Sequence, residues 1–415
     1  MKNNYMEYIV ALFYSFRQAA KFLSKKYWNF LGGNLDLFYI PALFYINDNY
    51  KDKKKVIHIL KVISIFIIYS IIQVIFNKHI YILKLIINLL KIFICYLVFL
   101  YVKENYKRFN LFKITLYTTI IILILTLCAF IFNNSTFFWR FNDGVNLFSL
   151  TRLQLFYLEP SELGFHLIPL IFIFVTIFLK SKSLIVKNIS VVFLVILLIP
   201  LYLAKSMGAI GIGLLSIVFM VFYDYYLEPS IFKRNTIFIL VIVGILTMWI
   251  LYITHNPLMD RLIYTLNGND GSNNYRISVS LNVLKESFFD YKMVGCGFGN
   301  LHTDSFISRY TSLGLTTVVV NSFIYFIIET GIFGILIVAG IIFMLYKYSL
   351  KSKSILKFGL TTFIVFYSFV GGHFTSGLTW AFYGLIISDL DDIHILDQCN
   401  STILNIKNRL NIFLD

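Results

Sequence analysis

Two arginines, two carboxylates and a histidine gather in one short part of the chain, where they could move a proton beside an anionic group. They are Arg140, Arg152, Glu159, Glu162 and His166. The last three follow i, i+3, i+7 spacing, so a helix that begins near the proline between them would place them on one face. Carboxylates and imidazoles are common general acids and bases. Acidic residues at a helix start also offset the helix dipole, and for Glu162 this simpler interpretation remains open.

A second group of such residues lies in a polar stretch, residues 255–320. Within residues 275–291, apolar side chains recur at helical spacing: Ile277, Leu281, Leu284 and Phe288. The opposite face has polar side chains: Ser278, Asn282, Lys285 and Ser287. This pattern predicts a helix that lies in the headgroup region of a membrane, with Arg276 at its start.

The run after this predicted helix combines alternate glycines with ionisable residues. Gly297 and Gly299 precede Asn300, and His302 and Asp304 follow. Alternate glycines allow a backbone to turn tightly and to approach a ligand. The run lacks the spacing of a dinucleotide-binding motif, and no strand precedes it. His302 could act as a base, although a single histidine or aspartate in a loop is usually only solvated.

A third group lies inside an apolar segment, where Lys84, Asn88 and Lys91 share one helical face. If the helix enters the membrane at residue 80, Lys91 lies roughly 15 Å deep. A cation at that depth pairs with a partner or faces a wet cavity, and a lipid head group or pyrophosphate would be such a partner. Snorkelling on a tilted helix is the alternative. Glu329 allows the same two interpretations.

The elements that must position these residues are transmembrane helices. The chain has 415 residues, of which 58% are hydrophobic and 14% charged. Apolar runs of spanning length recur, and they predict helices because lipid offers no other partner to the backbone. They cover residues 56–76, 80–102, 114–133, 163–179, 188–204, 206–222, 235–254, 321–346, 358–372 and 375–389. We therefore expect an all-α polytopic membrane bundle with about 10–12 transmembrane helices and one large external loop.

The distribution of charge orients this bundle. The net charge of +15 does not indicate nucleic acid, because the excess lies in alternate short loops, and such basic loops stay in the cytosol. The loops 134–162 and 255–320 then face outward from a membrane domain of residues 56–389. We expect residues 1–55 to be partly membrane-inserted or interfacial, and 390–415 to form a cytosolic tail. The pentapeptide YLEPS occurs at 157–161 and 226–230, on opposite faces, as a chance repeat.

Several motifs are absent from the sequence. It has no HExxH, Walker loop, GxSxG or CxxC, and no DxD-type pair on the predicted outer face. We therefore expect neither a metal ion nor a nucleotide cofactor. The four cysteines provide no disulfide framework.

The order of these motifs resembles the O-antigen and capsule polymerase (Wzy-like) and O-antigen ligase superfamily. The resemblance covers roughly residues 135–335. It consists of an outer-loop arginine, the Glu159-Pro160-Ser161 helix start, a Ser-Met-Gly-Ala helix opening at 206, the long outer loop with arginine and GxGxGN, and Asn321-x7-Glu329-x-Gly331-x-x-Gly334. Ligases typically have a histidine where this chain has Val320, which favours a polymerase. The interval from Arg152 to Gly164 is one residue longer than the RX10G spacing of polymerases.

The resemblance implies a metal-independent glycosyltransferase of the bacterial cytoplasmic membrane. It would transfer a growing glycan from undecaprenyl pyrophosphate onto a lipid-linked oligosaccharide, with a chain-length regulator and a flippase as further partners. Arg152 and Arg276 would hold the pyrophosphate, since guanidinium groups bind phosphate at two points. The base would be Glu159, then His302, then His166 in order of preference. The alternatives are an O-antigen ligase and a polysaccharide flippase or other transporter, although a transporter would more naturally show internal repeats.

Overall fold

The computed structural model describes residues 4–16, 36–77, 80–141, 151–268 and 270–414, and within them the chain is almost entirely helical. The helices of more than 20 residues are α4 (Lys53–Phe76), α5 (Ile82–Asn105), α6 (Leu111–Ile131), α7 (Pro160–Lys180), α8 (Leu184–Ala204), α9 (Met207–Leu227), α10 (Ile231–Ile253), α15 (Ser322–Ser352) and α18 (Asp392–Leu414). The shorter ones include α1 (Asn4–Ser15), α3 (Ile40–Asn49), α11 (Pro257–Leu266), α12 (Gly271–Asn274), α13 (Ser280–Asp290), α14 (Asp304–Arg309), α16 (Ile355–Ser368) and α17 (Gly377–Ile387).

Single helical turns complete the structure: η2 (Leu37–Tyr39), η3 (Tyr106–Arg108), the π-helical turn η4 (Tyr275–Val279), η5 (Asn300–His302) and η6 (Thr311–Leu313). The only strands among the described residues are β1 (Trp139–Arg140) and β2 (Arg152–Leu153), which pair antiparallel.

Seven of the described helices are long and apolar enough to cross a membrane: α4, α5, α6, α7, α8, α9 and α15. The protein is therefore an all-α, multi-pass membrane protein. Each of the ten apolar segments expected from sequence falls on a helix. Two of these helices are short, because α16 has 14 residues and α17 has 11. At 1.5 Å per residue they measure about 21 and 17 Å, less than the hydrocarbon thickness of a bilayer.

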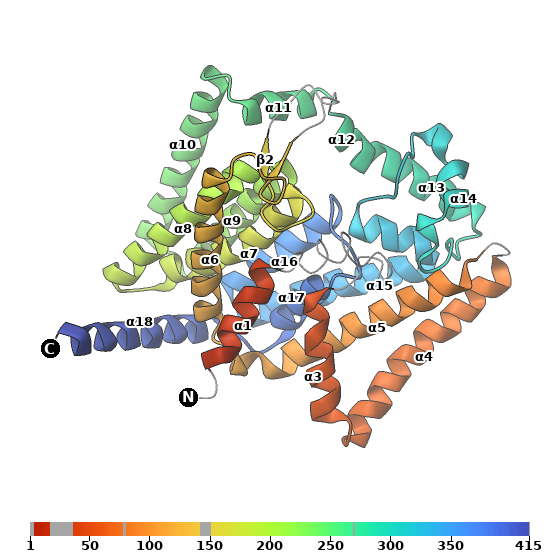
Figure 1. Ribbon diagram of the computed structural model, residues 1–415, viewed down its shortest axis with the longest axis horizontal. Helices are drawn as coiled ribbons and strands as arrows, with labels where there is room; N and C mark the ends of the chain where they lie inside the picture. The colour runs from red at the N-terminus through yellow and green to blue at the C-terminus, as the bar shows by residue number, and fades with distance from the viewer. Residues whose placement is uncertain (1–3, 17–35, 78–79, 142–150, 269, 415) are drawn as a thin grey trace.

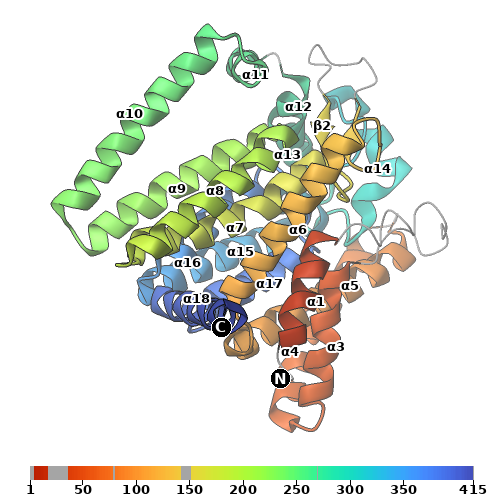
Figure 2. The ribbon, with the colours of Figure 1, turned by 60° about the vertical axis from the view of Figure 1, so that its left-hand side comes forward.

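The centre of the bundle is α7, which is mostly apolar and is buried on most sides. It packs against α8, α9 and α16, and α17 packs closely against α5 (Figure 1). By contrast α4 is mostly exposed. It is attached through polar side chains: Tyr69 Oη donates to the main-chain oxygen of Thr330 at 2.6 Å, and Gln73 Nε2 donates to that of Glu329 at 2.7 Å. Figure 2 shows α10 at the edge of the bundle beside α9.

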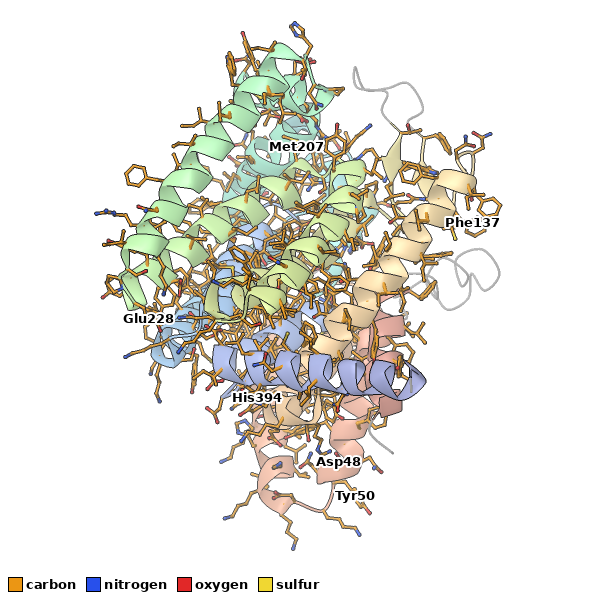
Figure 3. The ribbon with its side chains drawn as sticks, turned by 90° about the vertical axis from the view of Figure 1, so that its left-hand side faces the viewer. Asp48, Tyr50, Phe137, Met207, Glu228 and His394 are labelled. Carbon is orange, nitrogen blue, oxygen red and sulfur yellow. The ribbon has the colours of Figure 1, made fainter. Side chains whose placement is uncertain are left out.

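One end of the bundle, here named the loop end, carries β1, β2 and α11 to α14 (Figures 1 and 2). Figure 3 shows Phe137 and Met207 at this end, and Asp48, Tyr50 and His394 toward the other. The first residues after α9 lie away from the loop end, where Glu228 and Asp224 form ion pairs with Lys180 and Lys233 at 2.9–3.2 Å. The second YLEPS copy therefore lies in an ion-pair network remote from the first.

The predicted helix at 275–291 is present as η4 followed by α13, and it packs on the protein through a face that the sequence did not single out. Ser280, Val283 and Ser287 are buried, whereas Ile277 and Leu281 are exposed. The reason is tertiary: α13 packs against α15 and shares a small apolar core with the loop that follows it. The exposed Ile277 and Leu281 remain available to lipid.

Both ends of the chain contribute short or peripheral helices. α1 packs against α6, and α3 packs against α5. Arg17, Lys21, Lys25 and Lys26, which affect the topology of the N-terminal segment, lie outside the described residues. At the other end, α18 crosses the bundle opposite the loop end (Figure 3) and packs against α6 and α7.

Candidate functional site

A cavity of about 430 Å³ lies at the loop end and brings together ionisable side chains from distant segments. They are Asp36, Lys91, Glu159, Glu162, His166, Arg276, His302 and His373. We name it the arginine cavity. Six of the residues singled out from sequence line it, although the chain places up to 211 positions between them: Lys91, Glu159, Glu162, His166, Arg276 and His302. Arg140, Arg152, Gly297, Gly299 and Asn300 are not part of its lining.

The start of α7 explains how Glu159 reaches this cavity. Glu159 is the N-cap residue with extended backbone (φ −139°, ψ 145°), and Pro160 occupies the first helical position. The exposed carboxylate accepts a hydrogen bond from Ser161 Oγ at 3.0 Å through Oε2, and its Oε1 lies 3.9 Å from Arg140 Nη1. Glu162 follows in the first turn. Glu159 and Glu162 therefore belong both to an ordinary helix start and to the lining of the arginine cavity.

His166 is a buried side chain whose ring is held by its own helix. Nδ1 lies 2.7 Å from the main-chain oxygen of Glu162. Because a carbonyl oxygen only accepts, Nδ1 is assigned as the donor, which leaves Nε2 as the proton-accepting nitrogen of the neutral ring. The rings of Tyr14 and Tyr157 pack against it at 5.3 and 4.7 Å between centroids. This packing fixes the ring orientation in the cavity wall.

Arg276 lies in the π-helical turn η4, and its side chain reaches the segment that joins α16 to α17. Nη1 donates to the main-chain oxygen of Val370 at 3.1 Å. The side-chain amide of Asn321 donates to the main-chain oxygens of Arg276 at 2.7 Å and of Phe369 at 2.6 Å. π-helical turns often occur at functional sites. Here the turn and Asn321 together direct the guanidinium group to the arginine cavity.

A second cavity, of about 330 Å³, adjoins the first and shares His302, Tyr325, Lys91, His373 and Thr375 with it. Its remaining lining comes from Lys84, Ile87, Asn88, Gly299 and Phe374, and we name it the lysine cavity. Lys84 Nζ donates to the main-chain oxygen of His302 at 3.1 Å. The His302 side chain is partly exposed to solvent, but protein atoms of the cavity wall surround much of its ring. The resulting desolvation, followed by the positive charges of Lys84 and Lys91, lowers the pKa of His302 below its usual value. A neutral ring at pH 7 can accept a proton.

The glycine run, Gly297 to Asn300, mainly contacts the main chain of other segments and contributes little to the lining of the two cavities. The N–H of Gly297 donates to the main-chain oxygen of Glu329 at 3.0 Å. Gly299 has φ +78°, and a Cβ added there would lie 2.5 Å from the main-chain oxygen of Lys84. Asn300 Oδ1 accepts from the N–H of Tyr81 at 2.7 Å, at the start of α5. The run therefore positions α5 and its lysines; Gly299 lines the lysine cavity, while Gly297 and Asn300 line neither cavity.

The buried carboxylate of Glu329 connects the same elements. Asn88 Nδ2 donates to its Oε2 at 3.0 Å, and the N–H of Leu301 donates to Oε1 at 3.4 Å. Two residues further on, α15 is kinked at Gly331 (φ 57°, ψ −135°), where a Cβ would collide with the main-chain oxygen of Met293. Glu329 and the kink thus join α5, α15 and the glycine run into one support for the cavities.

Arg140 and Arg152 lie directly opposite each other in the ladder of β1 and β2. Like charges in this arrangement repel each other. Arg152 is half-buried, and its Nε donates to the main-chain oxygen of Ala204 at 3.1 Å. Burial, then the positive charges of Arg261 and Arg140, lower the pKa of Arg152 to about 10; Glu159 opposes the shift and Arg276 adds to it. A cluster in which cations disfavour one another binds an anion more strongly than isolated cations do.

Sequence reasoning missed the segment 369–376, which supplies Gly371, Gly372, His373 and Thr375 to the arginine cavity. Two adjacent glycines between two short apolar runs were the available signal. Among the described residues, no group of three or more His, Cys, Asp or Glu side chains is arranged to hold a metal ion.

No protein-family model matches the chain, and no curated protein matches it. The function must therefore be argued from the site itself.

Proposed function

We propose that this protein is a polysaccharide polymerase, which transfers a growing glycan from undecaprenyl pyrophosphate onto a lipid-linked repeat unit at the outer face of the cytoplasmic membrane. One observation carries the proposal: the arginine cavity combines a guanidinium group with carboxylates and histidines at the loop end of a multi-pass bundle. Glycosyl transfer from a pyrophosphate needs both an anion-binding group and a base. The motif order described from sequence gives the same assignment.

In the proposed transfer, a hydroxyl of the acceptor sugar gives its proton to Glu159 while its oxygen forms a bond to the anomeric carbon of the donor sugar. The bond from that carbon to the pyrophosphate oxygen breaks, and its electron pair leaves with the pyrophosphate. The proton then passes from the carboxylate to water. His302 and His166 line the same cavity and are the next candidates for the base.

The charge that develops on the leaving pyrophosphate requires nearby cations. Arg276 lines the cavity, and the Arg140 and Arg152 pair lies beside Glu159. Among the described residues, the Arg276 guanidinium makes one hydrogen bond, to Val370, so further N–H groups remain to bind phosphate oxygens. A planar guanidinium group binds two such oxygens at once, which a lysine cannot do.

The decisive experiment replaces Arg276 in cells that depend on this protein for surface polysaccharide. Arg276→Ala and Arg276→Lys should both leave single repeat units in place of long chains, with the protein retained in the membrane. Arg309→Ala is the matched control, because this arginine belongs to the same loop and pairs with Asp290 at 3.1 Å outside the cavity. Full-length polymer from Arg276→Ala would overturn the proposal, and normal activity of Arg276→Lys would refute the two-point contact.

The same experiment separates the alternatives. A ligase defect would leave long polymer on its lipid carrier without transfer to the final acceptor. A flippase or transporter defect would leave repeat units on the cytosolic leaflet.

A further inference from the structure

We infer that the lysine cavity binds the pyrophosphate of the acceptor lipid while the arginine cavity binds that of the donor, so that the protein holds two lipid-linked pyrophosphates at once. This inference rests on the proposed function and assigns its two substrates to two places.

The charges of the two cavities differ in kind. The lysine cavity has two lysines and two histidines in its lining and no carboxylate. The arginine cavity has three carboxylates in its lining, Asp36, Glu159 and Glu162. A lining with two lysines and no carboxylate suits an anionic group that is only held, whereas proton transfer needs the carboxylates. The lowered pKa of His302 reflects in part the positive charge of Lys84 and Lys91.

The chemistry of the two lipids matches this division. The pyrophosphate of the donor is the leaving group, so it must lie beside the base and a guanidinium group that binds it at two points. The pyrophosphate of the acceptor takes no part in bond breaking, because its lipid reacts through a hydroxyl of its glycan. The point charge of an ammonium group is sufficient to hold it.

The lysine cavity is also accessible from the lipid. Lys84, Ile87 and Lys91 lie on one side of α5, at spacings of three and four residues. Ile87 lines the cavity, yet it is exposed, as are the nearby Leu83 and Leu90. This apolar exposed surface faces acyl chains in a bilayer. A lipid can therefore place its pyrophosphate at the lysines while its tail stays in the membrane.

The shared wall makes simultaneous binding productive. Lys91, His302 and Tyr325 line both cavities, so the two cavities adjoin at these residues. A glycan attached to a pyrophosphate in the lysine cavity can extend past His302 toward Glu159. Its terminal hydroxyl then meets the donor sugar.

The test measures how many molecules of sugar-free undecaprenyl pyrophosphate bind the purified full-length protein in phosphatidylcholine nanodiscs. We expect two per chain for the wild type and one for Lys84→Gln/Lys91→Gln. Arg276→Gln should also bind one, and the triple variant none. Lys285→Gln, on the exposed face of α13, is the matched control and should bind two. The one lipid that remains in the double lysine variant and in Arg276→Gln verifies that each of these two proteins is folded.

Kinetics provide the second readout. With purified donor and acceptor, Lys84→Gln should raise the KM for the acceptor about tenfold, the loss expected for one charge-assisted contact, and leave the KM for the donor unchanged, because Lys84 lines the lysine cavity alone. Lys84→Arg should restore the KM for the acceptor. An active wild-type polymerase that binds only one lipid overturns this inference and leaves the proposed function intact. Failure of the proposed function appears separately, as normal chain length in Arg276→Ala cells.

Competition distinguishes the sources of a phosphate group. Inorganic pyrophosphate should displace the second lipid from the lysine cavity. If phosphatidylglycerol displaces it equally well, the cavity is a general site for anionic lipid, and the inference is wrong.

Discussion

Asn321 joins Arg276 to the opposite wall of the arginine cavity. Its side-chain amide donates to the main-chain oxygen of Arg276 at 2.7 Å and to that of Phe369 at 2.6 Å. Asn321 is fully buried. The position of the guanidinium group therefore depends on a residue that is not part of the cavity lining.

Asn321→Ala should reduce polymer formation about 30-fold, because losing two buried hydrogen bonds, each worth about 1 kcal/mol, would release the π-helical turn. The measurement is the rate of chain extension by purified protein. Asn282→Ala is the control, since Asn282 lies on the exposed side of α13. A rate equal to wild type would show that Arg276 is positioned without this amide.

The two copies of YLEPS offer a matched pair of glutamates. Glu159→Gln should lower the rate by about 10²–10⁴-fold, as expected for loss of a general base. Glu228→Gln changes the same residue in the same pentapeptide, but in the ion-pair network remote from the loop end. It should leave the rate unchanged. If Glu159→Gln is as active as Glu228→Gln, the base is a histidine of the cavity.

Acid should abolish the proposed polymerase activity, at a pH below the ordinary histidine pKa of 6.5, if His302 accepts the proton. Its pKa is lowered by desolvation and by the charges of Lys84 and Lys91, so the neutral ring persists until the pH falls below its usual pKa. Lys84→Gln removes one positive charge, which raises the pKa and moves the acid limb of the pH–rate profile upward. NMR titration of labelled histidine should show the same change. An acid limb that stays in place in Lys84→Gln would exclude His302 as the base.

Gly299→Ala should destabilise the protein by about 2–5 kcal/mol, from positive φ and from collision with the main chain of α5. Gly268→Ala separates the two causes. Gly268 also has positive φ, +72°, yet nothing lies within 4 Å of an added Cβ. It should cost only about 1 kcal/mol. Thermal unfolding in nanodiscs measures both, and equal shifts would mean that α5 moves aside at little cost.

The helices of this protein were predictable because each apolar run specifies its own structure in lipid. The helix that follows Arg276 was also predictable from periodicity. Its buried face was not, because the contact of Ser280 and Ser287 with other elements depends on how α13 docks on α15. The spacing of apolar residues along a helix does not show which neighbouring element the helix packs against.

The candidate site, too, was predictable from the sequence only in part. Glu159, His302 and Arg276 were singled out by residue type and predicted position near the membrane surface, and their roles were expected from the family resemblance. The segment 369–376 was missed because its part in positioning Arg276 depends on main-chain oxygens, which every residue has. The pairing of Arg140 with Arg152 was missed because it joins two strands of two residues each.

The shortness of α16 and α17 has a consequence for selectivity. The polar connection between them forms cavity wall at a place where longer helices would have kept hydrocarbon. In the proposed transfer, water would therefore reach the donor bond together with the sugar acceptor. Under the proposed function, the donor glycan would then escape hydrolysis because the correct hydroxyl is oriented for attack, and not because water is excluded from the cavity.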